Sequence, residues 1–144
     1  NKSKVSLSLS DVFCVERHRN DFLDLINNYV DILFANEEEL KSLFCSNLKN
    51  SLNSLKKIVN VGAVTRGKKG SLVFNDKETL NIESKKIKEV VDSTGAGDIY
   101  AAGFLFGISK SFSLEKCAIL GTNCAANIIS YYGARPQIKL KTLL

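Results

Sequence analysis

Two glycines, two hydroxyls and two carboxylates stand within seven residues, Asp-Ser-Thr-Gly-Ala-Gly-Asp at 92–98. Gly95 and Gly97 flank a small residue, so the backbone can reach positive φ angles and approach a ligand closely. The loop runs into a predicted helix at 96–109, whose first N–H groups have no partner in the chain. The glycine turn and the start of the helix together predict an anion site suited to phosphate.

Asp98 stands in the first turn of this predicted helix. The helix dipole favours a carboxylate there, and a simple capped turn from strand to helix is one explanation. A carboxylate that faces a phosphate repels it, however, so plain phosphate binding does not explain Asp98. A base that takes a proton from a hydroxyl attacking the phosphate does explain it, and such a base contributes roughly 10²- to 10⁴-fold. The loop therefore indicates phosphoryl transfer, with the capped turn as the alternative.

Two further polar clusters have residue types that suit a nucleotide and a metal ion. Gly67 and Gly70 bend the chain back after Thr65, so this turn could wrap a triphosphate; a lysine-rich hairpin turn is the alternative. Asn36 and Glu39 are three residues apart, on one face of a first helical turn. A carboxylate there could hold Mg²⁺ through water, and an Asn N-cap followed by acidic residues is the alternative.

The elements that must position these clusters alternate along the chain. Apolar runs predict strands and helical spacing predicts helices. The strands are expected at 5–9, 31–35, 59–65, 71–74, 79–82 and 87–91, and the helices at 18–29, 37–44, 96–109 and 114–132. Residues 45–54 are expected to be a polar linker before a short helix, and Gly133 a helix C-cap.

This alternation predicts an α/β fold with a mainly parallel sheet flanked by helices. The strands at 71–74 and 79–82 are expected to form a short antiparallel section. In such sheets ligands bind beyond the carboxyl ends of the strands, and all three polar clusters follow predicted strands. We therefore expect the three clusters to serve one site.

Composition excludes several classes of function. The chain has 144 residues, of which 44% are hydrophobic and 24% charged, as in a globular protein. Its net charge of +5 comes from scattered lysines without an aromatic-lined basic stripe, which argues against nucleic-acid binding. No apolar run approaches the roughly 18 residues of a membrane span. The chain also lacks methionine, and we interpret it as a piece of a longer protein.

The cysteines suggest a compartment. Their spacing fits no zinc pattern, and we expect all of them to be small buried side chains in a reducing, cytoplasmic environment. They are Cys14, Cys45, Cys117 and Cys124.

The sequence at 92–104, DSTGAGDIYAAGF, resembles the second signature of the ribokinase/PfkB family of sugar and nucleoside kinases. The Asn36–Glu39 pair resembles that family's N-x-x-E motif, and residues 65–70 resemble its T-x-G-x-x-G motif. Residues 120–136 resemble the helix that borders the adenine pocket. The resemblance implies that residues 1–144 are the C-terminal part of a single ribokinase-like kinase domain, with the N-terminal half and the lid absent.

The resemblance assigns roles in phosphoryl transfer. It implies that Asp98 is the base that deprotonates the acceptor hydroxymethyl group. The backbone of Gly95, Ala96 and Gly97 would form the anion hole for the transferring phosphoryl group.

The remaining matching residues would bind ATP and ions. Asn36 and Glu39 would position Mg²⁺ and phosphate through waters. The resemblance also implies residues that contact the nucleotide, and residues that form a monovalent-cation (K⁺) site found in some members. The nucleotide contacts are Thr65, Gly67 and Gly70, with Asn123 at the adenine, and the cation site is Asp92, Thr94 and Gly133.

The resemblance also implies the reaction. Residues 6–19 and 32–40 look most like bacterial adenosine-kinase-like members, which favours an ATP-dependent kinase acting on a primary hydroxyl of a nucleoside. A ribokinase- or fructokinase-type sugar kinase and a non-catalytic nucleotide-binding fragment are the alternatives. The expected partner is a small nucleoside or sugar, with no nucleic acid and no membrane, and the full-length protein is compatible with a homodimer.

Overall fold

The computed structural model describes residues 3–139 and 142, which form two compact units. The first unit comprises the described residues up to Arg66 together with Leu72–Leu80, and the second comprises Gly67–Ser71 and the described residues from Asn81 onward.

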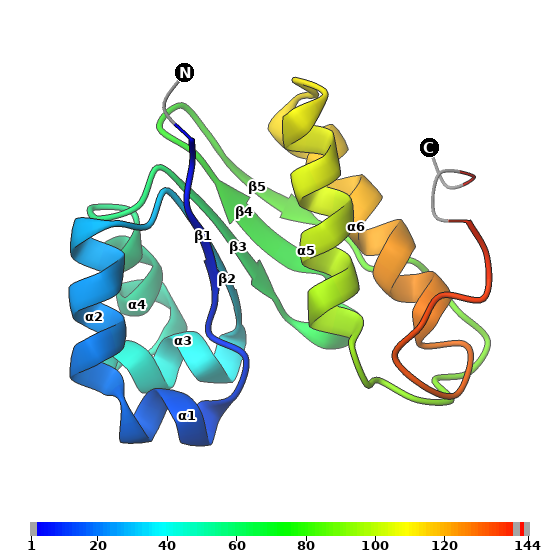
Figure 1. Ribbon diagram of the computed structural model, residues 1–144, viewed down its shortest axis with the longest axis horizontal. Helices are drawn as coiled ribbons and strands as arrows, with labels where there is room; N and C mark the ends of the chain where they lie inside the picture. Colours follow the sequence, from blue (N-terminus) through cyan, green and yellow to red (C-terminus); the bar gives the residue numbers. More distant parts are fainter. Residues whose placement is uncertain (1–2, 140–141, 143–144) are drawn as a thin grey trace. The chain divides into compact units, whose positions relative to one another are not determined.

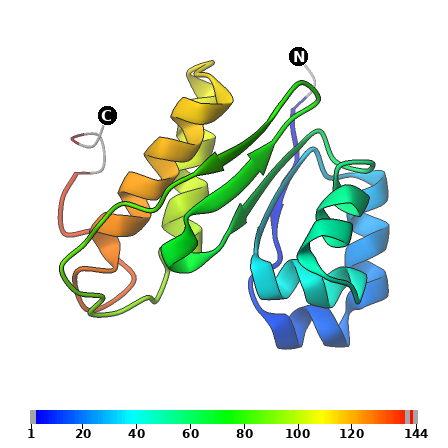
Figure 2. The ribbon, with the colours of Figure 1, turned by 180° about the vertical axis from the view of Figure 1, so that it is seen from behind.

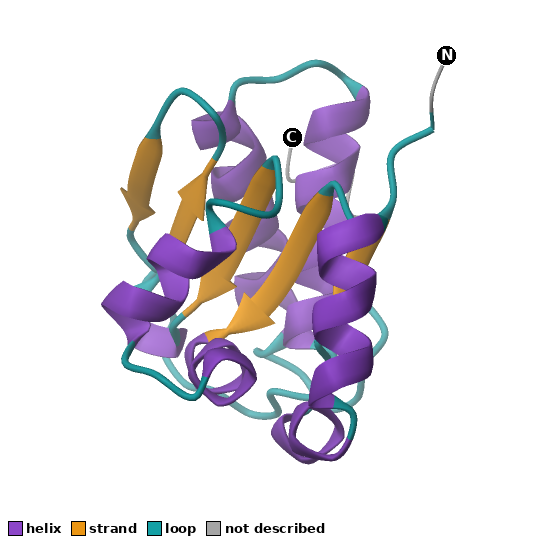
Figure 3. Cartoon of the chain, turned by 90° about the vertical axis from the view of Figure 1, so that its left-hand side faces the viewer, coloured by secondary structure: helices purple, strands orange, loops and turns teal. Residues whose placement is uncertain are grey.

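Strands and helices alternate in the first unit, as the sequence pattern predicts. Figure 1 shows the helices of this unit on one side of its first three strands, and Figure 3 looks from that side, with these helices in front of the strands. In chain order the elements are β1 Ser6–Ser8, α1 Val12–Arg17, α2 Arg19–Asn28, β2 Ile32–Asn36, α3 Glu37–Phe44, α4 Leu48–Leu55 and β3 Val61–Thr65.

The sheet has the order β1-β2-β3-β4-β5. Strands β1, β2 and β3 are parallel, and Asn36 at the end of β2 is in register with Thr65 at the end of β3. Strands β4 Ser71–Phe74 and β5 Thr79–Ile82 are joined by a short turn in which the Asn75 N–H donates to the Glu78 carbonyl at 3.0 Å. So short a connection requires an antiparallel pair. The expected fold class, a mainly parallel α/β sheet with an antiparallel section, is confirmed.

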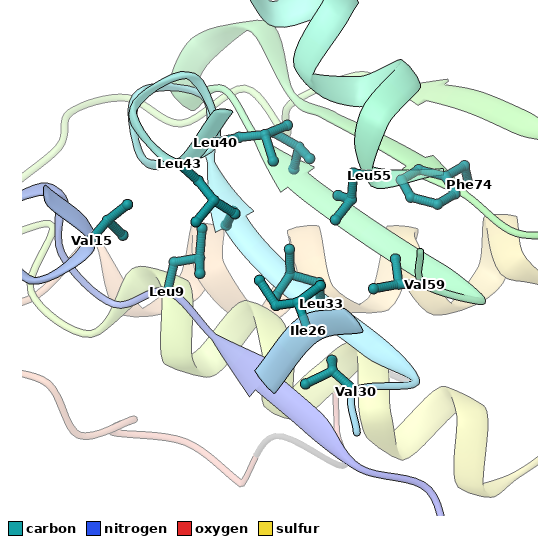
Figure 4. Packing of buried hydrophobic residues seen from close by; sticks show 12 residues of the cluster. Leu9, Val15, Ile26, Val30, Leu33, Leu40, Leu43, Leu55, Val59 and Phe74 are labelled. Atoms are coloured by element: carbon teal, nitrogen blue, oxygen red, sulfur yellow. The ribbon is translucent and has the colours of Figure 1, made fainter. Parts of the chain in front are cut away.

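The core of the first unit lies between its helices and strands β1–β3 (Figure 4). Leu33 of β2, Leu40 and Leu43 of α3 and Leu55 of α4 are all essentially inaccessible to solvent. Burying each such side chain contributes about 1.5–3 kcal/mol relative to exposure. The continuous apolar runs of β2 and β3 are therefore explained by burial, as is usual in parallel sheets.

Helices α5 Ala96–Ser109 and α6 Leu114–Ile128 lie side by side in the second unit (Figure 2). A Cβ added to Gly103 would lie 2.9 Å from the Cys124 sulfur, and one added to Gly107 would lie 2.8 Å from the Cys117 sulfur. Two glycines one turn apart therefore allow the helices to approach closely, and this contact fixes where α5 begins relative to α6.

The strand predicted at 87–91 is wrong. The N–H groups of Val91 and Asp92 donate to the Ile129 carbonyl at 2.8 and 3.4 Å, so they bond to the end of α6 and not to a neighbouring strand. Val90 and Val91 are 47% and 37% exposed. The β-branched composition that favoured a strand is thus not supported by a strand partner in the described residues.

Helix α6 ends at Ile128, four residues before the predicted end, and Gly133 is not its cap. The N–H groups of Ser130 and Tyr131 donate to carbonyls three residues back, which tightens the chain after the helix. Gly133 has a φ of 88° in the following loop.

Two other expectations need correction. Most of the linker expected at 45–54 is helix α4, which begins at the Asn47 N-cap, and helix α1 was not expected at all. Cys117 and Cys124 are buried as predicted, but Cys14 and Cys45 are exposed. Cys14 lies on the surface of α1 and Cys45 is the C-cap of α3, and both face solvent. A small apolar side chain is tolerated at such positions.

Among the residues that the structure describes, none of the helices combines the length and the hydrophobicity that crossing a bilayer requires.

Candidate functional site

Asn36 and Glu39 form a reciprocal pair at the start of α3. The Asn36 Oδ1 accepts from the Glu39 N–H at 2.8 Å, and the Glu39 carboxylate accepts from the Asn36 N–H at 2.8 Å and from Asn36 Nδ2 at 2.7 Å. This capping box satisfies two N–H groups that a helix start otherwise leaves without partners. The structure therefore bears out the N-cap alternative, and it also fixes the Glu39 carboxylate at the carboxyl end of β2.

The Glu39 side chain is 6% exposed. Burial is the main cause that raises the pKa of Glu39 above its ordinary value of 4.5, opposed by the Asn36 N–H bond and assisted by the negative charge of Asp11. Asp11 is the N-cap of α1, where its Oδ1 accepts from the Phe13 and Cys14 N–H groups. Two carboxylates from α1 and α3 therefore influence one another in the first unit.

Oxygen donors of this kind suit Mg²⁺, but the geometry limits how they could hold it. Both Glu39 oxygens already accept hydrogen bonds, and within residues 3–139 and 142 no three His, Cys, Asp or Glu side chains gather around a common point. Mg²⁺ usually keeps several of its waters in proteins. The Asn36–Glu39 pair thus suits a hydrated ion held through water.

We expect Asp11→Asn to lower the pKa of Glu39. Asn keeps an oxygen that can cap α1 but removes the charge that raises the Glu39 pKa. The pKa of Glu39 is higher in the folded protein than its ordinary value of 4.5. Glu39 therefore stabilises the fold at pH values below 4.5, and this contribution is lost as the pH rises through the folded pKa. NMR titration of the Glu39 carboxyl carbon measures the change. Asp76→Asn, at an exposed turn, is the control, and an unchanged Glu39 pKa in Asp11→Asn would contradict the expectation.

Thr65 lies beside Asn36 because the two residues are in register on β3 and β2. Its Oγ1 donates to the Ala35 carbonyl at 3.5 Å, which is a long hydrogen bond. The structure therefore gathers three predicted site residues, Asn36, Glu39 and Thr65, at the carboxyl ends of two parallel strands in the first unit.

The turn at Gly67–Gly70 belongs to the second unit. Gly67 and Gly70 have φ angles of 55° and 81°, in the left-handed region that favours glycine, and Gly67–Lys69 form one turn of 3₁₀-helix. The Gly70 N–H donates to the Gly67 carbonyl at 3.0 Å, and the Ser84 hydroxyl donates to the Lys68 carbonyl at 2.7 Å. Both glycines are therefore required by backbone conformation, and the turn is attached to the segment after β5.

Asp92, Thr94 and Gly133 come together in the second unit. The Asp92 carboxylate accepts from the Thr94 N–H and from the Gly133 N–H, each at 2.9 Å. Hydrogen bonds from Thr94 and then Gly133 hold the pKa of Asp92 below its ordinary value, so it is ionised at neutral pH. The carboxylate thus ties the loop before α5 to the loop after α6.

Gly95 is the N-cap of α5, with a φ of 75°. A Cβ at this position would lie 2.9 Å from the Ala134 Cβ, so close packing as well as conformation requires glycine. The Ala96 N–H donates to the Ser93 carbonyl at 3.2 Å, whereas the N–H groups of Gly97 and Asp98 have no hydrogen-bond partner within the described part of the chain. The first turn of α5 therefore offers two free donors at its positive end.

The Asp98 side chain is exposed in this first turn. It lies on the same turn as the free Gly97 N–H, so a carboxylate and main-chain donors share one helix start. The role predicted for Asp98, a base next to an anion site, stays a prediction.

Asn123 lines a pocket of about 190 Å³ in the second unit. On the α6 side, Asn123, Asn127 and Ser130 line the pocket with a spacing of four and three residues, which places them on one helix face. Lys85 and Ile87, from the segment after β5, also line it. Sequence reasoning found only Asn123; the helical spacing of Asn127 and Ser130 was a signal that could have added them.

The parallel strands, the glycine turn and the glycine-capped helix define an α/β protein of the ribokinase-like fold class. The nucleoside kinase structure of Methanocaldococcus jannaschii has the same fold, with a TM-score of 0.80 and 28% sequence identity in the structural comparison, which covers 93% of this chain and 44% of that chain. The profile of the pfkB family carbohydrate kinases matches residues 2–141, and the chain belongs to this family.

Other known proteins resemble this chain. The adenosine kinase structure from Sinorhizobium meliloti has a TM-score of 0.94 and 40% identity, covering 97% of this chain and 43% of that chain. A ribokinase of Lactococcus lactis is 34% identical over 134 residues, which are 87% of this chain and 43% of the relative. The chain therefore spans less than half the length of these relatives.

Proposed function

We propose that the protein transfers the terminal phosphoryl group of ATP to a primary hydroxyl of a nucleoside or a sugar. The observation that carries this proposal is the start of α5, where the exposed Asp98 carboxylate stands on the same helical turn as two N–H groups without partners in the described residues. Free donors at a helix N-terminus attract phosphate, and a carboxylate beside them is placed to accept a proton from a hydroxyl that attacks the phosphate.

In the proposed reaction Asp98 takes the proton of the acceptor hydroxyl as that oxygen bonds to the terminal phosphorus. The bond between this phosphorus and the bridging oxygen breaks, and ADP leaves with the electron pair. Main-chain donors of Gly95, Ala96 and Gly97 stabilise the charge on the transferring group, and losing one donor in such a site costs about 3–4 kcal/mol of barrier. The Ala96 N–H contributes only after it leaves the Ser93 carbonyl, which a bond of 3.2 Å permits.

The remaining roles follow the positions of the side chains within each unit. Asn36 and Glu39 hold hydrated Mg²⁺ through water, and the ion supplies neutralisation of phosphate charge when it is bound. Thr65, Gly67 and Gly70 contact the donor nucleotide. The 190 Å³ pocket next to Asn123 takes its adenine.

A monovalent cation such as K⁺ is proposed near Asp92, Thr94 and Gly133. Asp92 is ionised there, but both of its oxygens already accept N–H bonds. Any cation would therefore use the lone pairs that remain and the carbonyl groups of the two loops.

Adenosine is the favoured acceptor. The relative named adenosine kinase is 40% identical to this chain. In alignments of sequence alone, the Methanocaldococcus jannaschii nucleoside kinase is 32% identical over 123 residues and the Thermococcus kodakarensis cytidine kinase is 36% identical over 121 residues. A relative named ribokinase, at 34%, keeps a sugar as the second candidate. A cytoplasmic location and a homodimer of the full-length protein remain parts of the proposal.

A panel of acceptors tests the proposal. The protein, in the longest form that its gene encodes, is incubated with ATP and Mg²⁺ and with adenosine, cytidine, ribose or fructose, and ADP formation is measured. We expect turnover with a nucleoside to exceed turnover with either sugar, and we expect EDTA to abolish it because the phosphate charge is then not neutralised. Turnover with ribose alone would favour the sugar kinase, and ATP binding without turnover on any acceptor would favour the non-catalytic alternative.

A further inference from the structure

A buried pair of hydroxyl groups connects two parts of the candidate site, and none of the roles above uses it. The Ser71 Oγ and the Tyr100 hydroxyl oxygen are 2.9 Å apart, and the two residues are 1% and 3% exposed. Ser71 directly follows Gly70 of the glycine turn, and Tyr100 lies two positions after Asp98 in α5. Both residues belong to the second unit, so their relative position is part of one compact body.

Tyr100 is held firmly on the helix side. Its ring stacks on Phe104 with centroids 6.2 Å apart, and a Cβ added to Gly121 of α6 would lie 3.2 Å from two of its ring atoms. Burial raises the pKa of Tyr100 to about 12, so the phenol is neutral under ordinary conditions. Tyr100 is therefore a rigid, uncharged hydrogen-bond partner for Ser71.

The turn is also attached to the segment after β5. The Ser84 hydroxyl bonds to the Lys68 carbonyl, and the Gly70 N–H bonds to the Gly67 carbonyl within the turn. Gly67, Lys68 and Lys69 are exposed. The side-chain bond from Ser71 to Tyr100 connects the end of this turn directly to helix α5.

We propose that Tyr100 is a positioning residue, which acts through Ser71 to hold the Gly67–Gly70 turn at a fixed distance from the start of α5. The inference rests on the proposed function, in which the turn contacts ATP and Asp98 is the base. If the turn shifts, ATP contacts are lost although Asp98 remains in place. The hydroxyl pair therefore governs ATP binding more than the chemical step or the binding of the acceptor.

Three variants distinguish a positioning role of the hydroxyl pair from a hydrogen bond that only stabilises the core. Tyr100→Phe and Ser71→Ala each leave one buried hydroxyl without a partner, whereas the double variant removes both. An unpaired buried group destabilises, but removing both partners is nearly neutral. The melting temperature should therefore fall in each single variant and recover in the double variant. The KM for ATP should rise roughly three- to tenfold in all three, without recovery, while the KM for the acceptor is unchanged.

Hydrogen exchange gives a readout that needs no turnover. In the double variant without nucleotide, exchange of the Gly70 N–H should be faster than in the unmodified protein, because the turn has lost its tie to α5. Tyr29→Phe and Ser109→Ala, at exposed positions, are matched controls with no expected change. Absence of ATP turnover in the unmodified protein would count against the proposed function only. Hydrogen exchange of the Gly70 N–H would then decide whether Tyr100 positions the turn. Unchanged Gly70 exchange in the double variant, or a KM for ATP that recovers with the melting temperature, overturns the proposal.

Discussion

Replacing Asp98 with Asn should lower the rate of phosphoryl transfer by roughly 10²- to 10⁴-fold. Asn has nearly the same shape as Asp, but its amide cannot accept the proton of the acceptor hydroxyl. ATP affinity should be kept or rise slightly, because the side chain is not one of the groups that bind phosphate and the negative charge that repels phosphate is removed. Steady-state kinetics with the best acceptor gives kcat, and calorimetry with ATP gives the affinity of each form.

A loss of stability cannot account for an effect of that size. Asp98 is in the first turn of α5, where a negative charge stabilises a helix by about 0.3–1 kcal/mol, so Asp98→Asn should cause only a small shift in melting temperature. Asp76→Asn, in the exposed turn between β4 and β5, removes the same charge elsewhere and should leave kcat as it was. If Asp98→Asn turned over at the unmodified rate, the base would have to be another group.

Local signals predicted the elements that begin at the site. Helix α3 at Glu37–Phe44 and helix α5 at Ala96–Ser109 begin and end where the sequence placed them. In α3 the signal is an Asn and a Glu three residues apart, which can each accept a hydrogen bond from the other's backbone N–H. In α5 it is a glycine that must adopt a positive φ. Both signals lie within a few residues of the element, so the sequence contains them completely.

Long-range contacts explain what the sequence did not predict. The residues at 87–91 have strand composition, yet their backbone bonds to Ile129, and Gly133 looks like a helix cap but donates to Asp92, 41 positions away. The pairing of Ser71 with Tyr100 is of the same kind, since the two residues are 29 positions apart. The sequence pattern within one segment does not show such a distant partner, because each of these hydrogen bonds depends on how elements far apart in the sequence pack together.

The candidate site was predicted in its parts more than as a whole. Asn36, Glu39 and Thr65 gather in one unit because parallel register places the ends of β2 and β3 together. Asp92, Gly95 and Asp98 are close together in the second unit because the loop that contains Asp92 leads directly into the N-cap and the first turn of α5. The chemical roles of all these residues remain predictions, which the variants described here are designed to decide.

Gly70→Ala should be the most damaging glycine substitution in the turn. A Cβ at this position would lie 1.9 Å from the Ile82 carbonyl oxygen and 2.8 Å from the Ser84 nitrogen, both of them backbone atoms that cannot rotate away. Its φ of 81° is also unfavourable for any L-residue with a side chain. Strain and overpacking together should cost roughly 2–5 kcal/mol of unfolding free energy.

Gly67→Ala separates the two causes. Gly67 has a φ of 55°, in the same left-handed region, but a Cβ there would have no atom within 4 Å. This variant should therefore lose only the conformational part, about 1–2 kcal/mol. Chemical denaturation of both variants, fitted with a common slope, measures the difference between them.

The turn should also move in Gly70→Ala, because its backbone must leave the Ile82 carbonyl to make room. The Ser84 hydroxyl bond to the Lys68 carbonyl is then strained or lost, and the KM for ATP should rise more than in Gly67→Ala. Equal losses of unfolding free energy in the two variants would mean that the Ile82 carbonyl does not approach Gly70, and the close attachment of the turn to the segment after β5 would be wrong. A larger loss at Gly70 would support a constraint from that backbone contact, because both glycines have a positive φ but only Gly70 has neighbouring backbone atoms where a Cβ would lie.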